Sequence, residues 1–315
     1  MEQARQPRVA MFEDVHRPPD DLPERAARAE ELGIREIWLA EDCFLVGGVA
    51  SAAAALSATD SLRVGLGILP AVTRNPSTTA MELATLERLF PGRVIGGIGH
   101  GVSAWMAQIG ATPRSALEAL ETTIDAVRRL LRGETVTVSS GHWRLDEVTL
   151  AYPPSAAPPV YAGVRGPRSV AVSGRTADGT LLSDWAAPAY VRGVATALRE
   201  AGAAASHQLG VIVRVAVDDD RSRARDQMRD AVQPHLGRSD LRALFQPLAD
   251  EHEIDPERPS DDLIDELSLT GDEESVRRGL ERYAEAGADF VLLRPVPSEG
   301  AGADRLYRLC GQLNQ

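Results

Sequence analysis

The stretch that decides the fold runs from Arg63 to Gly101 and reads RVGLGILPAVTRNPSTTAMELATLERLFPGRVIGGIGHG. Its spacing predicts a strand over residues 63–70, a loop, a helix that begins at Pro76, and a second strand over residues 94–98. A Pro-Gly pair stops the helix, and glycines flank His100 where the second strand ends. In barrels and open α/β sheets, ligands bind at the C-terminal ends of the strands. This stretch therefore predicts a ligand site.

The same unit of strand followed by helix recurs along the chain. Eight strands are expected at residues 8–12, 36–40, 63–70, 94–98, 159–163, 179–183, 209–217 and 289–293. Amphipathic helical patterns separate them, and this alternation predicts a (β/α)8 TIM barrel, with residues 1–315 as a single domain. Two insertions interrupt it. A hairpin-like stretch, residues 135–150, follows strand 4, and an acidic stretch between strands 7 and 8, residues 239–270, is expected to form short helices or a mobile excursion.

Composition narrows the class of function. The formal net charge of -12 argues against a nucleic-acid partner and against a polybasic membrane anchor. No apolar run approaches the roughly 20 residues of a membrane span, and the polar N-terminus lacks a signal core. The two cysteines, Cys43 and Cys310, are too few and too distant for a disulfide framework. We therefore expect a soluble cytoplasmic protein with no membrane or nucleic-acid partner.

Several polar side chains directly follow predicted strands and would meet at the C-terminal mouth of a barrel. Glu41 and Asp42 follow strand 2 and read either as an acid and a base or as residues that hold a loop. His100 lies between two glycines, and it reads either as a site residue or as a packed histidine. The other strand ends offer Glu13, Asp14, Ser183, Trp185 and Arg294. The six histidines include no HxH or HExxH pair, so we expect no metal site.

The loop GVRGPRS, residues 163–169, is a candidate phosphate cradle. Glycines in the loop free backbone N–H groups, and a proline suits the first turn of the helix that follows. The N-terminus of a helix favours an anion, and two arginines add positive charge. The alternative is an ordinary turn with exposed arginines. Earlier in the chain, Arg74 reads either as a ligand contact or as part of a helix start that Asn75 caps.

The chain resembles the bacterial luciferase-like flavin oxidoreductases, and more closely the branch that uses the deazaflavin coenzyme F420. The resemblance covers nearly the whole chain. Its carriers are EIWLAED at 36–42, VGLGILPAVTRNP at 64–76, LERLFPGRVIGGIGHG at 86–101, YAGVRGPRSV at 161–170, RTADG at 175–179 and LTGDEESVRRGLERYAEAGADFVLLRP at 269–295. Each segment alone is a weak signal, and their combination is specific for the family.

The resemblance implies a barrel, often dimeric, with an insertion between strands 7 and 8 and a flavin or deazaflavin across its mouth. It also implies a non-proline cis peptide in strand 3 that backs the cofactor ring, and the matching pair here is Gly67-Ile68. The expected cofactor contacts are Gly67, Ile68, Arg74, Gly99, His100, Gly101, Gly163, Val164, Arg165, Gly166, Pro167 and Arg168.

Three departures from the family bear on the substrate. Many relatives carry a catalytic histidine at the end of strand 2, where this chain has Asp42. Sugar-phosphate dehydrogenases of the family place a glutamate where this chain has Val102. The lysines that such enzymes use for substrate phosphate have no counterpart, because the chain contains no lysine. These differences argue against a sugar phosphate and against light-producing chemistry.

The leading hypothesis is an oxidoreductase that transfers a hydride between coenzyme F420 and a small organic substrate. His100 would hydrogen-bond near the cofactor ring, and Asp42 or Glu41 would donate or orient a proton. The first alternative is an FMN-dependent monooxygenase with a separate reductase. The second, of another class, is a non-catalytic flavin-binding protein. From the resemblance we also expect a homodimer.

Overall fold

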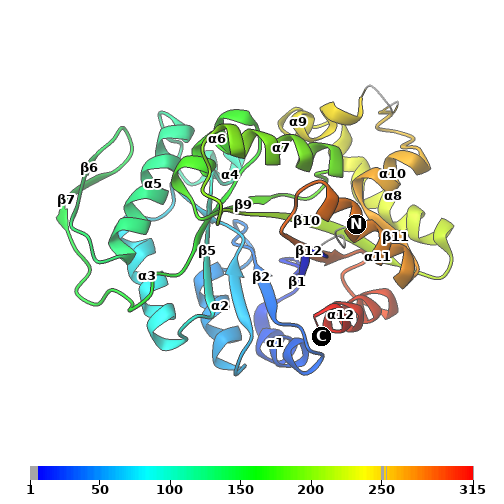
Figure 1. The fold of residues 1–315 in the computed structure, drawn as a ribbon, viewed down its shortest axis with the longest axis horizontal. Helices are drawn as coiled ribbons and strands as arrows, with labels where there is room; N and C mark the ends of the chain where they lie inside the picture. The colour runs from blue at the N-terminus through cyan, green and yellow to red at the C-terminus, as the bar shows by residue number, and fades with distance from the viewer. Residues whose placement is uncertain (1–5, 250–251, 253, 315) are drawn as a thin grey trace.

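The computed structural model describes residues 6–249, 252 and 254–314. Within this part of the chain, parallel strands close into a barrel in which β12 pairs with β1 and completes the ring (Figure 1). The barrel strands are β1 (Arg8–Phe12), β2 (Glu36–Leu39), β3 (Arg63–Leu66) with β4 (Leu69–Pro70), β5 (Val94–Gly99), β8 (Val160–Gly163), β9 (Gly179–Leu182), β10 (Gln208–Val217) and β12 (Phe290–Pro295). With β3 and β4 taken as one interrupted strand, these are the eight strands predicted from the sequence.

Helices surround the barrel and connect its strands. The longer ones are α1 (Leu22–Glu31), α2 (Gly48–Ser57), α3 (Pro76–Leu89), α5 (Ala116–Leu131), α6 (Pro167–Thr176), α7 (Pro188–Glu200), α8 (Arg221–Leu236), α11 (Glu273–Glu285) and α12 (Ala301–Leu313). Polar side chains fix several helix starts. Asn75 caps α3 by accepting a hydrogen bond from the backbone N–H of Ser77 at 3.0 Å, as predicted. Asp220 and Asp272 cap α8 and α11 in the same way.

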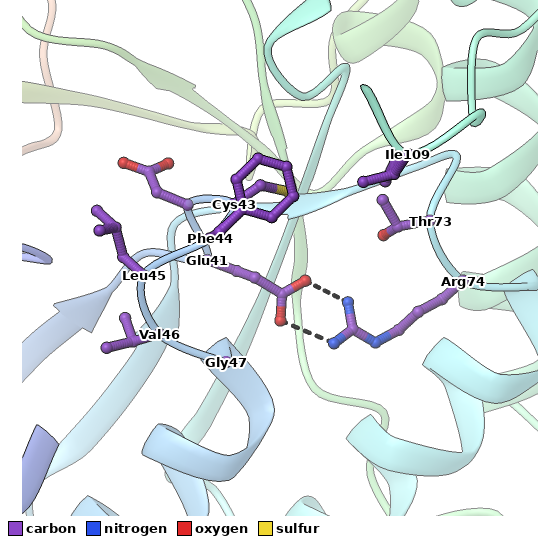
Figure 2. Close-up of a pocket in the computed structure, with 10 residues that line it drawn as sticks. Glu41, Cys43, Phe44, Leu45, Val46, Gly47, Thr73, Arg74 and Ile109 are labelled. Carbon is purple, nitrogen blue, oxygen red and sulfur yellow. Dashed lines mark hydrogen bonds and ion pairs between the residues drawn. The ribbon is translucent and has the colours of Figure 1, made fainter. Parts of the chain in front are cut away.

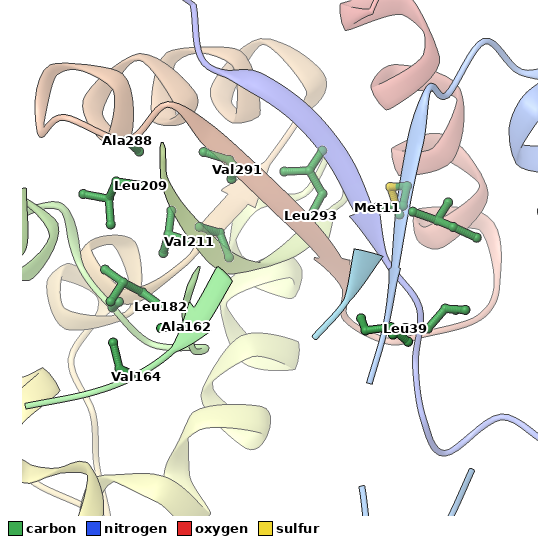
Figure 3. Close-up of a cluster of buried hydrophobic side chains, with 14 of the residues drawn as sticks. Met11, Leu39, Ala162, Val164, Leu182, Leu209, Val211, Ala288, Val291 and Leu293 are labelled. Atoms are coloured by element: carbon green, nitrogen blue, oxygen red, sulfur yellow. The ribbon is translucent and has the colours of Figure 1, made fainter. Parts of the chain in front are cut away.

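Two apolar layers hold the barrel together, because successive residues of a strand point to opposite faces. On β12, Val291 and Leu293 pack in the layer between strands and helices, part of which Figure 3 shows. The neighbouring Phe290 packs inside the barrel, where its ring stacks on that of Trp38 with the centroids 5.9 Å apart. A Cβ at Gly210 would lie only 2.0 Å from the Phe290 ring. A glycine is therefore required beside this aromatic interior.

The insertion after β5 carries α4 (Ser103–Gln108), α5 and a hairpin of β6 (Val136–Ser139) and β7 (Arg144–Val148). The hairpin lies outside the barrel, beside α5, at the left of Figure 1. Its turn reaches back toward the mouth. The indole N–H of Trp143 donates to the hydroxyl of Thr123 at 3.0 Å and to the carbonyl of Ala71 at 3.3 Å. The hairpin is thereby tied to the loop that follows β4.

The insertion between β10 and β12 contains helical pieces, as expected. The short elements here and before α1 are η1 (Pro19–Asp21), η2 (Ser239–Leu241), α9 (Arg242–Phe245), η3 (Gln246–Leu248) and α10 (Asp261–Leu267). Residues 250, 251 and 253 of this insertion lie outside the described residues. The sequence-based prediction was wrong at its end, because β11 (Leu269–Gly271) pairs in parallel with the end of β10. The prediction was also incomplete at residues 63–70, where the strand is interrupted between Leu66 and Leu69.

Candidate functional site

The floor of the barrel mouth is built around the side chain of Ile68. Between β3 and β4 the Gly67–Ile68 peptide bond is cis, as the family resemblance implies. Glycines on the neighbouring strands β5 and β8 leave the room that Ile68 occupies. A Cβ at Gly163 would lie 2.4 Å from Cγ2 of Ile68, and one at Gly99 would lie 2.8 Å from its Cδ1. No larger residue fits at either glycine while Ile68 keeps this position.

His100 follows β5 directly and links the floor to the next loop. Its Nε2 lies 2.8 Å from the hydroxyl oxygen of Ser169, in the first turn of α6. Burial lowers the pKa of His100, and the positive charge of Arg165 lowers it further. The buried Nδ1 lies near the backbone of Ala116 without a well-aligned hydrogen bond to any described residue. His100 is therefore a neutral imidazole at pH 7, with one ring nitrogen held by the loop after β8.

That loop turns into α6 at Gly166, whose φ of 79° lies in the left-handed region. The backbone N–H of Gly166 donates to the hydroxyl of Tyr190 at 3.3 Å, which fixes the turn. The first N–H groups of a helix lack intrahelical acceptors and favour an anion. Arg165 is half-buried beside this turn, and Arg168 is exposed. The loop thus has the backbone geometry and the charge of an anion site.

Two of the predicted cofactor residues are tightly packed. The side chain of Val164 is buried in the apolar layer between strands and helices, so only its backbone can meet a ligand. Gly101 has a φ of 73°, and a Cβ there would lie 3.0 Å from both Pro70 and Met106. Both residues shape the mouth through the backbone.

Glu41 and Arg74 form a two-pronged ion pair between the loop after β2 and the loop after β4 (Figure 2). Nη2 of Arg74 donates to Oε2 of Glu41 at 2.7 Å, and Nη1 donates to Oε1. Oε2 of Glu41 also accepts from the backbone N–H of Gly48, at 2.9 Å. Nε of Arg74 lies 3.2 Å from the carboxylate of Glu82. These contacts occupy both side chains and anchor the two loops to each other.

Asp42, the next residue, has a different environment. Burial raises its pKa, as does the charge of Asp184, while Arg294 and His16 act in the opposite direction. Asp42 borders an open pocket of about 570 Å³. The other lining residues come from three loops: Glu41, Cys43, Phe44, Leu45, Val46, Gly47, Thr73, Arg74 and Ile109 (Figure 2). The surroundings of Asp42 thus raise the pKa of its carboxyl group and favour the protonated form.

A chain of ion pairs connects the C-terminal ends of β1, β9, β10 and β12. These strands lie on the other side of the barrel from Ile68. Arg294, on β12, donates to Oδ2 of Asp184 at 2.9 Å and to Oδ1 of Asp14 at 3.3 Å. Arg214, on β10, donates to the same Asp184 oxygen at 3.0 Å. Burial alone would raise the pKa of Asp14, but hydrogen bonds from His16 and Ser298 and the charge of Arg294 hold it below its usual range.

Arg214 was not predicted, unlike the strand-end residues Asp14, Ser183, Trp185 and Arg294. The available signal was one charged residue inside an otherwise apolar strand, GVIVRVAV. Its guanidinium lies 4.8 Å from the centroid of the buried Trp185 ring. Burial lowers the pKa of Arg214, and the adjacent Asp184 opposes that change. Arg214 is thus held on the wall of the mouth by an aromatic ring and a carboxylate.

Glu13, which also ends a strand, is not at the mouth surface. It is buried between two outer helices, where it accepts hydrogen bonds from Tyr307 at 2.6 Å and from Arg25 at 3.2 Å. Among the described residues, no group of three or more histidine, cysteine, aspartate or glutamate side chains is placed to hold a metal ion. Over the same residues, no helix is long and apolar enough to cross a membrane.

The fold defines a (β/α)8-barrel protein, and in such barrels active sites lie at the C-terminal ends of the strands. The model of the luciferase-like monooxygenase family matches residues 4–289, and the chain belongs to this family.

Relatives of this chain carry the names of F420-dependent enzymes. An F420-dependent glucose-6-phosphate dehydrogenase of Nakamurella multipartita is 29% identical over 67% of this chain and 68% of its own length. One from Kineococcus radiotolerans is 25% identical over 87% of this chain and 86% of its own. The coenzyme F420-dependent tetrahydromethanopterin reductase of Methanopyrus kandleri superposes with a TM-score of 0.82, at 20% identity, over 98% of both chains. The last comparison supports the fold.

Proposed function

We propose that this protein is an oxidoreductase that transfers a hydride between coenzyme F420 and a small organic substrate. The observation that carries the proposal is the packing of the Ile68 side chain at the floor of the mouth. Because Gly99 and Gly163, on two adjacent strands, have no side chain, the side chain of Ile68 can occupy the floor. F420 is favoured as the cofactor because relatives that match most of the chain are named F420-dependent.

The residues around this floor fit a ring with an anionic tail. Gly67 and Ile68 would lie beneath the ring, with Gly99, His100 and Gly101 along one edge. The loop of Gly163, Val164, Arg165, Gly166, Pro167 and Arg168 would hold the phosphate through the first turn of α6. When bound, F420 supplies the hydride donor or acceptor. Arg74, which we expected at the cofactor, would act indirectly by holding the loop after β4 in place.

In this proposal, the protein's own residues position the cofactor and the substrate and donate one proton to the substrate. Asp42 borders the pocket, and burial favours its protonated form, so it is the proposed proton donor to the substrate. Glu41 is engaged by Arg74 and Gly48, and we assign it the anchoring of the loop. His100 would stay neutral, and its contact with Ser169 would hold the imidazole ring in place at the edge of the floor.

The FMN-dependent monooxygenase remains the second candidate, because the family to which the chain belongs is that of the luciferase-like monooxygenases. That function requires a separate reductase as a partner and consumption of oxygen. A non-catalytic flavin-binding protein is the third candidate.

Titration of the purified protein with F420 and, separately, with FMN tests the proposal, with the fluorescence of each ring as the signal. We expect saturable binding of F420 and hydride transfer from bound, reduced F420 to an organic acceptor. Tight binding of FMN, no binding of F420 and coupled oxygen consumption would contradict the proposal in favour of the monooxygenase. F420 binding without transfer to any acceptor would favour the non-catalytic protein.

We further infer a cytoplasmic homodimer built from one domain per chain. The single domain is supported by the C-terminal end of the chain, where Asn314 donates a hydrogen bond to the carbonyl of Val9 at 3.2 Å. Met81 and Leu89 are exposed apolar side chains on α3 that a dimer interface would bury. Light scattering of the wild-type protein and of a Met81→Ser, Leu89→Ser variant tests the dimer. A monomeric wild-type protein would contradict it.

A further inference from the structure

Apolar side chains surround the pocket beside Asp42 and remain exposed. Phe44, Leu45 and Ile109 expose 65%, 48% and 44% of their surfaces. They come from two separate segments, the loop after β2 and the end of α4, yet all three line the same pocket (Figure 2). Exposed apolar groups that gather at a pocket indicate a ligand or partner with an apolar surface.

The cations near this pocket already have carboxylate partners. Arg74 pairs with Glu41, and its Nε lies 3.2 Å from Glu82. Arg294 lies between Asp14 and Asp184, at 3.3 and 2.9 Å.

The second arginine of the ion-pair chain is placed in the same way. Arg214 shares the Asp184 carboxylate with Arg294, at 3.0 Å. Around Arg214 and Arg294, two carboxylates balance two guanidinium groups, and Asp42 adds a third carboxyl group nearby. A phosphate at this wall would therefore meet acidic groups beside every arginine it could reach.

We propose that the substrate of this site is an uncharged, largely apolar molecule whose carbonyl or hydroxyl group reaches Asp42, and that phosphorylated sugars are excluded. The apolar rim would hold the body of the molecule. Asp42 is the acidic residue at the pocket edge that forms no ion pair within the described part of the chain. This assignment rests on the proposed function. It separates the chain from its relatives named for glucose 6-phosphate.

The first experiment compares substrates on the F420-bound wild-type protein. Binding of F420 is measured beforehand by fluorescence, and the initial rates are then compared for cyclohexanone with reduced F420 and for glucose 6-phosphate with oxidised F420. Calorimetry on the F420-bound protein measures binding of inorganic phosphate, glucose 6-phosphate and cyclohexanone independently of turnover. We expect binding and turnover of the ketone, and a kcat/KM at least about 100-fold lower for the sugar phosphate.

The second experiment tests the rim and the ion-pair chain with matched variants. Phe44→Ala should weaken ketone binding about tenfold, whereas Tyr152→Ala, at another exposed aromatic residue, should leave it unchanged. Asp184→Asn should tighten binding of inorganic phosphate about tenfold, because it leaves two arginines with one carboxylate. Asp125→Asn, on the outer surface of α5, is the charge-matched control.

The outcomes separate the two proposals. A protein that binds no F420 contradicts the proposed function. A protein that binds F420 and turns over glucose 6-phosphate as well as the ketone contradicts only the substrate assignment. The substrate assignment is also contradicted if wild-type protein binds phosphate as tightly as the Asp184→Asn variant does, or if Phe44→Ala leaves ketone binding unchanged. Thermal melting of each variant distinguishes a lost site from a lost fold.

Discussion

The side chain of Ile68 fills the space that any side chain at Gly163 would need, since a Cβ there would lie 2.4 Å from Cγ2 of Ile68. Ile68 lies in the break between β3 and β4, and Gly163 ends β8. Their close fit therefore joins the interrupted third strand to the loop that would hold the cofactor phosphate. A shift of Ile68 at the floor would therefore also shift the loop that begins at Gly163, and the reverse holds too.

Gly163→Ala should disturb the floor. We expect about 1–3 kcal/mol of destabilisation from overpacking and at least a tenfold loss of F420 affinity, measured by thermal melting and by fluorescence titration. Gly193→Ala, on α7, is the matched control because a Cβ there meets no atom within 4 Å. Adding Ile68→Ala removes the clashing methyl group and should restore stability in part. Equal behaviour of the two glycine variants would contradict a close fit at the floor.

His100 should make stability depend on pH. Burial lowers its pKa from the usual 6.5, so the unfolded chain binds a proton before the folded protein does. Stability should therefore fall as the pH falls below about 6.5, and His100→Gln should flatten part of that slope. Thermal melting from pH 7.5 to pH 5 checks this. The same slope in wild type and variant would rule out a buried neutral imidazole at this position.

Asp42→Asn should lower kcat by about 100-fold or more while F420 still binds, because the amide cannot donate a proton in the same way. In the wild-type protein the protonated form is the active one, so the rate should fall as the pH rises through the raised pKa of Asp42. Asp184→Asn removes a charge that raises that pKa, and it should move the falling limb to lower pH. Stopped-flow rates across pH measure both effects. A pH profile that Asp42→Asn leaves intact would exclude Asp42 as the donor.

Glu41→Gln should affect stability and leave the pH profile in place. The substitution removes the charge that Arg74 pairs with in a half-buried setting, and we expect a loss of about 1–3 kcal/mol. Glu31→Gln breaks an exposed pair with Arg28, in which both side chains are 66% exposed, and should have no measurable effect. Chemical denaturation compares the two variants. Loss of the falling limb of the rate in Glu41→Gln would mean that Glu41, too, carries the proton.

The sequence predicted the barrel because period-two strands and amphipathic helices follow each other with short connections. It did not predict β11, since three residues with a threonine at the centre, Leu269–Gly271, are too short to show an alternation. It read residues 63–70 as one strand, because nothing in the local pattern separates β3 from β4. Only the resemblance to a family led us to expect a cis peptide at Gly67-Ile68, where the strand breaks.

The sequence predicted which residues follow the strands, and the roles given to these residues stay predictions. Asp42, His100 and the loop from Gly163 lie at strand ends, and strand ends meet at the mouth. The ion pair between Glu41 and Arg74 joins residues that are 33 positions apart on different loops. Nothing in the sequence indicates that these two residues are partners. Arg214 was missed because it lies within a strand and not at the strand's end.

The hairpin of β6 and β7 adds a further consequence. Through Trp143 it is bonded to Ala71, three residues before Arg74, so the rim of the mouth is held from outside the barrel as well as from within. A change in the length or turn of the hairpin would therefore shift the loop after β4. Substrate selectivity could thus be altered by substitutions outside the barrel.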